Sequence, residues 1–241
     1  MTTLPRSVKP VLSSLRGRLN EIRSRISRAA ARAGRSPGDV ILIAVTKTVP
    51  PATVAEAIAL GLTDLGENRV QEAEAKIRLL GSTVRWHLIG HLQRNKAGKA
   101  VELFERVHSV DDVELAVTLD RRAAAARRRL PVLIEVNVSG EPSKFGVAPE
   151  GLEELVGRVA SMPSLSLDGL MTVGAPVARP EDAREGFERL RWLRDRASER
   201  TGVALPHLSM GMSGDFEVAI ESGSTMVRLG TALFGPRDAE G

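Results

Sequence analysis

The stretch VILIAVTK, residues Val40–Lys47, decides the fold. Its first six residues are apolar and mostly β-branched, and Gly38-Asp39 and Thr46-Lys47 stand on either side of them. A short apolar run bounded in this way is typical of a fully buried strand. Seven more short runs follow along the chain, at Thr63–Gly66, Val84–Ile89, Arg106–Val110, Val132–Val138, Leu165–Met171, His207–Met210 and Met226–Leu229.

Helical patterns separate these runs. They cover Pro51–Leu60, Val70–Leu80, Arg94–Leu103, Val113–Arg127, Pro149–Ser161, Pro180–Arg200 and Gly214–Glu221. Strands that alternate with helices form a parallel sheet, and eight such strands close into a barrel. The sequence therefore predicts an α/β fold, a single (β/α)8 TIM-like barrel. The alternative is an open doubly wound sheet, but the G-x-G-x-x-G pattern of that fold is absent after the first run.

Particular residues mark the predicted helix starts. Pro51, Pro149 and Pro180 stand near the first turn, where a missing N–H is tolerated. Asp111 and Ser213 are predicted helix caps.

An extra helix is predicted before the barrel, at about residues 7–33. Apolar residues recur there at helical spacing, at Val8, Leu12, Leu15, Leu19, Ile22 and Ile26. An Arg-rich transit peptide is the alternative for this segment, but the amphipathic pattern favours a helix that belongs to the fold. With the barrel at about residues 40–236 and no linker, residues 1–241 are expected to form one domain.

Composition narrows the function classes. The 241 residues include no cysteine and no tyrosine, which excludes disulfides and thiolate chemistry. The four histidines lack a metal-binding spacing, so no metal site is expected. The net charge is only +4, and aromatic residues that could stack on bases are few, so we do not expect a nucleic-acid partner. No apolar run is long enough to predict a membrane span, and a cytoplasmic location is expected.

Lys47 is the most informative single residue. It is one of only six lysines, and it follows an apolar strand. This position is at the end of the barrel where TIM-barrel enzymes have their active sites. Partial burial there favours the neutral amine, which attacks aldehydes to form a Schiff base. The alternative for Lys47 alone is a lysine that extends from a strand end to solvent.

The last two predicted loops suggest a phosphate site. Gly211–Gly214 precede a predicted helix, and Gly230-Thr231 follow the last strand. The seventh and eighth loops of such barrels commonly bind phosphate, although glycines that only shape turns are the alternative. A lysine that reacts with aldehydes, together with a phosphate site, indicates pyridoxal 5'-phosphate as the cofactor.

Arg228 is expected to contact the pyridine nitrogen of that cofactor. It lies two residues before Gly230, on the same face of the strand. A guanidinium keeps its protons, so beside the pyridine nitrogen it would leave that nitrogen unprotonated. The alternative is a surface salt bridge.

At this point the chain resembles the pyridoxal phosphate homeostasis protein family, which is related to the N-terminal barrel of alanine racemases. The motifs that carry the resemblance are Ala44–Lys47, Gly66–Glu72, Trp86–Lys96, Glu135–Ser139, Lys144–Gly146, Gly169–Met171, Leu208–Asp215, Gly223–Thr231 and Phe234-Gly235. Two positions depart from the usual pattern, because members usually have tyrosine or a similar residue at Arg69 and a different residue at His91.

The resemblance implies roles for individual residues. Lys47 would be the Schiff-base lysine and Arg228 the partner of the pyridine nitrogen. Ser213, Gly230 and Thr231 would bind the phosphate, and Asn68 and Met210 would lie close to the ring. The resemblance also implies a role in pyridoxal phosphate homeostasis, in which the protein holds and buffers the cofactor or delivers it to apo-enzymes.

Two other functions are weighed against this one. A racemase-type enzyme would need a second base, usually a tyrosine of another domain, and this sequence has no tyrosine. His87 is an alternative base. RNA binding by the Arg-rich helices is a minor alternative. We expect a monomer or a weak homodimer, and whether Lys144 contacts a second cofactor molecule is left open.

Overall fold

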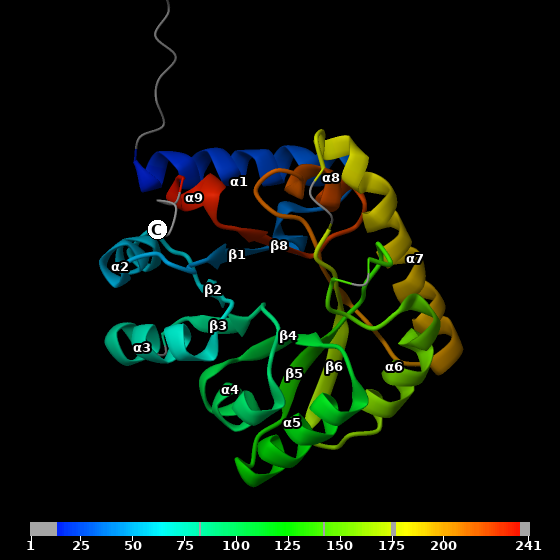
Figure 1. Ribbon diagram of the computed structural model, residues 1–241. Helices are drawn as coiled ribbons and strands as arrows, with labels where there is room; N and C mark the ends of the chain where they lie inside the picture. The colour runs from blue at the N-terminus through cyan, green and yellow to red at the C-terminus, as the bar shows by residue number, and fades with distance from the viewer. Residues whose placement is uncertain (1–13, 82, 142, 175–176, 237–241) are drawn as a thin grey trace, which may run out of the picture.

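The computed structural model describes residues 14–81, 83–141, 143–174 and 177–236. Eight strands close into a barrel in sequence order, and each pairs in parallel with its neighbours (Figure 1). The strands are β1 (Ile41–Val45), β2 (Asp64–Glu67), β3 (Arg85–Leu88), β4 (Arg106–Val110), β5 (Leu130–Glu135), β6 (Leu165–Met171), β7 (His207–Ser209) and β8 (Met226–Leu229). The predicted TIM-like barrel is confirmed.

Helices follow the strands and cover the outside of the barrel (Figure 1). They are α2 (Pro51–Ala59), α3 (Val70–Leu80), α4 (Ala97–Leu103), α5 (Val113–Ala125), α6 (Leu152–Ala160), α7 (Arg184–Thr201), α8 (Phe216–Glu221) and α9 (Thr231–Phe234), with short 3-10 turns at Pro37–Asp39, Arg94–Lys96, Pro149–Gly151 and Pro180–Ala183. Apolar side chains of the helices pack against the outer face of the strands in one continuous core.

The extra N-terminal helix is α1 (Leu15–Arg32), and residues 7–13, with which the predicted helix begins, lie outside the described part of the chain. It packs against α8 and α9, next to the last strand (Figure 1). Its buried side chains include Leu19, Ile22 and Ile26. Ion pairs to α8 add to this contact, with Arg25 2.6 Å from Glu217.

Strand β5 runs over Leu130–Glu135 and not over the predicted Val132–Val138. After Glu135 the backbone pairs with its own loop, because Asn137 N–H donates to the Val147 carbonyl at 3.0 Å and Val147 N–H donates to the Glu135 carbonyl at 2.8 Å. Gly146 permits this pairing, since its φ is +110° and a Cβ there would lie 2.6 Å from the Asn137 nitrogen.

Both predicted caps are wrong in detail. Asp112, and not Asp111, caps α5, where its Oδ1 accepts from Leu115 N–H at 2.6 Å. Ser213 does not cap α8, which begins only at Phe216. Its hydroxyl instead accepts from Ala232 N–H in α9 at 3.1 Å. The first error is a shift of one residue, which a local pattern does not resolve. The second arises because Ser213 contacts a segment that is distant in the sequence.

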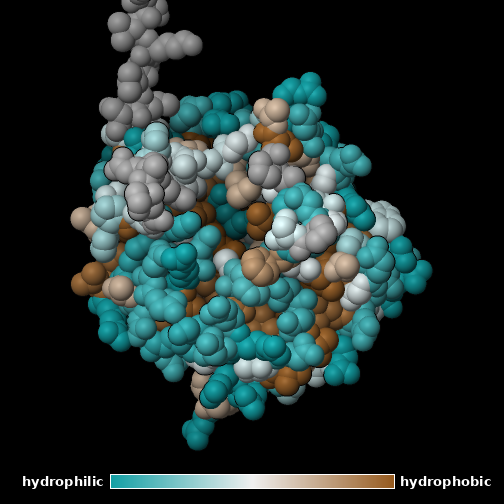
Figure 2. All heavy atoms as spheres, viewed as in Figure 1, coloured by the Kyte–Doolittle hydropathy of each residue, from teal (hydrophilic) through white to brown (hydrophobic). Residues whose placement is uncertain are grey.

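The surface is mostly hydrophilic, and Figure 2 shows a hollow in it over the region where Figure 1 draws β1 and β8. Within the described ranges, no helix has the length and apolar character needed to cross a membrane.

Candidate functional site

Lys47 occupies a tight turn directly after β1. The turn is closed by Val49 N–H, which donates to the Thr46 carbonyl at 2.9 Å, and Thr48 adopts a left-handed φ of +61°. A non-glycine residue in this conformation is held there by its surroundings. The side chain of Lys47 is half-buried, and within the described residues its ammonium group has no ion pair or hydrogen bond. Its amine is thus available to a ligand.

A buried ion pair contacts the residue before Lys47 and stabilises this turn. Lys76 of α3 lies 2.6 Å from Glu67 at the end of β2 and also donates to the Thr46 carbonyl. Glu67 accepts a second hydrogen bond from the Thr46 hydroxyl at 2.6 Å. The ion pair therefore fixes the backbone one residue before Lys47.

Six of the seven predicted cofactor-binding residues line one cavity of about 360 Å³ at the carboxyl ends of the strands. The lining comprises Val45, Lys47, Asn68, Ile89, Val173, Met212, Ser213, Gly214, Arg228, Gly230 and Thr231. Polar groups and apolar walls alternate there, as in other small-molecule sites of this size.

Met210 is the seventh predicted residue, and it does not line this cavity. Its side chain is fully buried in the hydrophobic core. Met212, two residues later and 37% exposed, takes a place in the cavity wall.

Arg228 has an unusual environment for a cation. It is buried, and among the described residues its guanidinium donates only to neutral oxygens, namely the Ser209 carbonyl at 2.7 Å, the Ser209 hydroxyl at 2.8 Å and the Thr172 carbonyl at 2.8 Å. Burial lowers the pKa of Arg228 to about 10, although the carboxylates of Glu135 and Asp215 oppose this shift. A buried cation held by neutral acceptors at a cavity wall is well placed to donate a hydrogen bond to a ligand.

Glu135 is a titratable group near the site that sequence reasoning missed. It is buried at the end of β5, where burial raises its pKa to about 7, the Asp111 carboxylate adds to the shift and Arg228 opposes it. A charged residue inside an otherwise apolar strand was the available signal.

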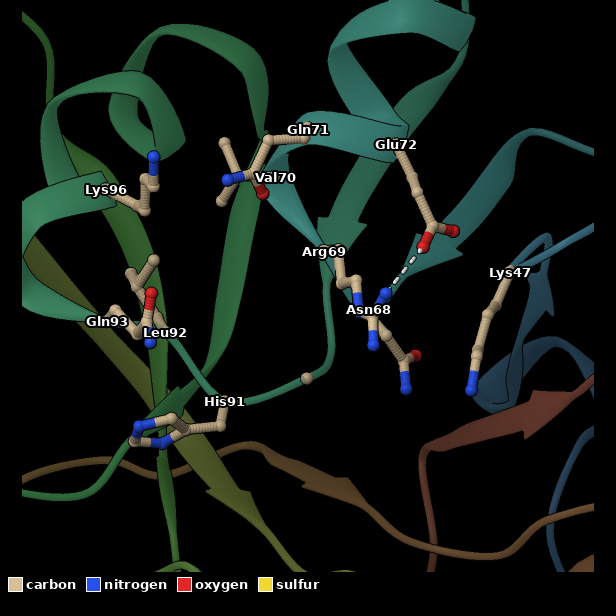
Figure 3. Close-up of a pocket in the computed structure, with 11 residues that line it drawn as sticks. Lys47, Asn68, Arg69, Val70, Gln71, Glu72, His91, Leu92, Gln93 and Lys96 are labelled. Carbon is tan, nitrogen blue, oxygen red and sulfur yellow. Dashed lines mark ion pairs between the residues drawn. The ribbon is translucent and has the colours of Figure 1, made fainter.

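A second, larger cavity of about 620 Å³ adjoins the first, and Lys47 and Asn68 line both. Figure 3 shows the side chains of Lys47 and Asn68 extending into the same space, with His91 on the far side. His91 stacks on the ring of Phe145, with ring centroids 3.9 Å apart. This cavity forms the approach to Lys47.

Two glycines bring the loops of the site together. A Cβ on Gly90 would lie 2.5 Å from the carbonyl oxygen of Asn68, so only glycine lets the loop after β3 approach the loop that carries Asn68. Gly211 has a φ of +95°, and a Cβ there would lie 2.5 Å from that of Ala219.

His87, the alternative base, is not at the cavity. Its ring is 2% exposed and is hydrogen-bonded to His108 at 2.9 Å and to Asp64 at 3.0 Å, inside the barrel. Strand β3 directs this side chain into the interior, which the sequence could not show.

The chain matches known proteins both in sequence and in structure. Residues 18–238 match the family model of the alanine racemase N-terminal domain. The chain is 46% identical over 221 residues to the pyridoxal phosphate homeostasis protein of Aquifex aeolicus (strain VF5), covering 91% of this chain and 97% of that protein. It is 45% identical over 228 residues to the protein of the same name from Pseudomonas aeruginosa, covering 94% and 97%. The chain belongs to the pyridoxal phosphate homeostasis protein family.

Solved structures of this family and beyond share the fold. PipY of Synechococcus elongatus PCC7942, solved with pyridoxal phosphate bound, superimposes with a TM-score of 0.82 at 36% identity, covering 92% of this chain and 100% of PipY. Alanine racemase of Clostridium difficile 630 gives a TM-score of 0.74 at 16% identity, and the match covers 94% of this chain but 57% of the racemase. At that identity the likeness to the racemase concerns the fold alone.

Proposed function

We propose that this protein binds pyridoxal 5'-phosphate as a Schiff base on Lys47 and acts in pyridoxal phosphate homeostasis. One observation carries the proposal: a lysine amine and a buried arginine line the same cavity of about 360 Å³, and in the part of the chain that the structure describes the amine has no partner and the arginine donates only to neutral groups. The cofactor supplies the aldehyde and the ring, and the protein supplies the amine and the surroundings. The PipY structure with pyridoxal phosphate bound and the names of the relatives support this assignment.

The residues around the cavity have distinct roles in the proposal. Arg228 donates to the pyridine nitrogen and leaves it unprotonated. Asn68 lies beside Lys47 (Figure 3) and would contact the ring.

The phosphate would be bound by the loops after β7 and β8. Ser213, Gly230 and Thr231 line that part of the cavity. The Ser213 hydroxyl accepts from Ala232 N–H, and its own proton is left to donate to a phosphate oxygen. This hydrogen bond also ties the two loops to each other.

The proposal favours a cofactor-holding protein over a racemase. Arg228 makes the ring a weak electron sink, because the pyridine nitrogen stays unprotonated. The chain has no tyrosine, and the buried His87 does not face the cavity, so neither residue supplies a second base opposite Lys47. The protein therefore buffers the cofactor and delivers it to apo-enzymes. A cytoplasmic location, where such apo-enzymes are synthesised, and a monomer or weak homodimer are parts of the same proposal.

The visible spectrum of the purified protein, titrated with pyridoxal phosphate, tests the proposal. We expect a Schiff-base absorption band that is lost in Lys47→Ala. The matched control is Lys96→Ala, because Lys96 lines the adjoining cavity but not the cavity that contains Arg228. A band that survives in Lys47→Ala and disappears in Lys96→Ala would contradict the assignment.

A further inference from the structure

A line of buried polar side chains crosses the inside of the barrel and ends at Arg228. Asp64 at the start of β2 lies 3.0 Å from His87 Nε2, and His87 Nδ1 lies 2.9 Å from His108 Nε2. His108 Nδ1 in turn lies 3.0 Å from the Ser209 hydroxyl, which accepts from Arg228 at 2.8 Å. Because β4 and β7 are not neighbours in the barrel, the bond between His108 and Ser209 must cross its interior.

The protonation states of the charged and titratable members are fixed by their surroundings. Burial raises the pKa of Asp64, but hydrogen bonds from His87, Arg85 and Thr63 outweigh it and hold that pKa well below its usual range, so Asp64 is a carboxylate. Burial lowers the pKa of His87 and, still more, that of His108, where His87 and Arg228 add to the effect. Both rings are therefore neutral at neutral pH.

These states allow only one direction of donation. The Asp64 carboxylate can only accept, so His87 donates from Nε2 and accepts at Nδ1. His108 must then donate from Nε2 and accept at Nδ1, and the Ser209 hydroxyl must donate to His108. Arg228 can only donate, and it closes the series at the cavity. All the bonds point from Arg228 towards Asp64, and hydrogen bonds aligned in this way strengthen one another.

We propose that Asp64, His87, His108 and Ser209 are positioning residues that orient the Arg228 guanidinium towards the ligand in the cavity. The inference rests on the proposed function, because it concerns the group that Arg228 contacts there. The Ser209 oxygen presents its lone pair to Arg228 while its proton is used by His108, so the series stabilises the buried cation. The same contact occupies an N–H of Nη1, so the N–H groups left for the ligand are on Nη2 and Nε.

Ser209→Ala removes one atom, the hydroxyl oxygen that links Arg228 to His108 in the series of hydrogen bonds. Arg228 keeps its bonds to the backbone carbonyls of Ser209 and Thr172, so its side chain stays at the cavity wall, but its guanidinium loses the hydroxyl contact that orients it and links it to His108. Ser109→Ala is the matched control, because Ser109 is also buried in a barrel strand and its hydroxyl has no hydrogen-bond partner in the described part of the chain.

The first test uses the protein without cofactor. Nitrogen-15 NMR of histidine-labelled protein at pH 7 should show His87 and His108 as neutral rings protonated at Nε2 only. In Ser209→Ala we expect both rings to keep the Nε2 tautomer, because Asp64 still fixes it, but the His108 Nδ1 resonance should shift because this nitrogen loses the hydrogen bond from Ser209; in Ser109→Ala we expect no change. A wild-type ring protonated at Nδ1 would overturn the inference, whether or not the protein binds pyridoxal phosphate.

The second test compares pyridoxal phosphate with its 1-deaza analogue, in which a C–H replaces the pyridine nitrogen. Ser209→Ala should weaken pyridoxal phosphate binding about three- to tenfold, the value of one lost hydrogen bond, and leave the analogue unaffected. Equal affinities of Ser209→Ala and wild type for pyridoxal phosphate, or equal losses for both ligands, would overturn the inference. Failure of the wild type to bind either ligand would instead contradict the proposed function.

Discussion

Lys76→Met should strongly destabilise the protein, because it leaves a buried carboxylate without its partner. Glu67 is fully buried, the Lys76 side chain is 9% exposed, and their charged atoms are 2.6 Å apart. At an effective dielectric constant of about 20, this separation corresponds to an attraction of about 6 kcal/mol, much of which offsets desolvation. Removing one partner of a buried pair costs about 3–5 kcal/mol. For a chain of this size, that lowers the melting temperature by roughly 6–20 °C.

Chemical and thermal unfolding of three variants would test this value. Lys99→Met is the control, because Lys99 makes ion pairs at the surface and should change the midpoint little. The double variant Glu67→Gln/Lys76→Met should recover much of the loss, because no unpaired charge remains. A loss for Lys76→Met no larger than that for Lys99→Met would refute the account of how the turn before Lys47 is held.

Three further predictions concern the site. Burial raises the pKa of Glu135 to about 7, so ionisation of this carboxyl opposes folding. Glu135→Gln should therefore have the stability of the wild type near pH 4 and be up to about 3 kcal/mol more stable near pH 8.5. A gain in stability that does not depend on pH in urea unfolding would count against this. Thr231→Val should weaken binding of pyridoxal phosphate more than that of pyridoxal, whereas equal losses in a spectral titration would argue against a phosphate contact. The holo-protein should not exchange the α-proton of amino acids into deuterated water at a useful rate; NMR would detect rapid exchange dependent on Lys47, which would show an enzyme.

The barrel was predictable because each strand has a local signal. Val40–Val45 is apolar, the seven later runs are short and each contains apolar residues, and their number and alternation with helices determine the architecture. The end of β5 was less predictable, because Val136 and Val138 are as apolar as the strand itself, but the segment leaves the strand and pairs with Val147 of its own loop. That pairing depends on tertiary structure, which the pattern of apolar residues does not show.

The candidate site was predictable where residues follow strands directly. Lys47 follows β1, Arg228 lies near the carboxyl end of β8, and the structure brings the two to one cavity. Met210 was misplaced because the direction of a side chain at a strand end depends on where the strand leaves the barrel. His87 and His108 gave no sign of their contact, since 21 residues separate them and only the register of β3 against β4 brings them together.

The central claim is that Lys47 holds pyridoxal phosphate, and peptide mapping after borohydride reduction tests it most directly. Reduction makes the bond between the lysine and the cofactor permanent, so mass spectrometry of the digest identifies the modified residue. We expect one pyridoxyl group per chain, on the peptide that contains Lys47. A pyridoxyl group found on Lys96 or Lys144, with Lys47 unmodified, would contradict the claim.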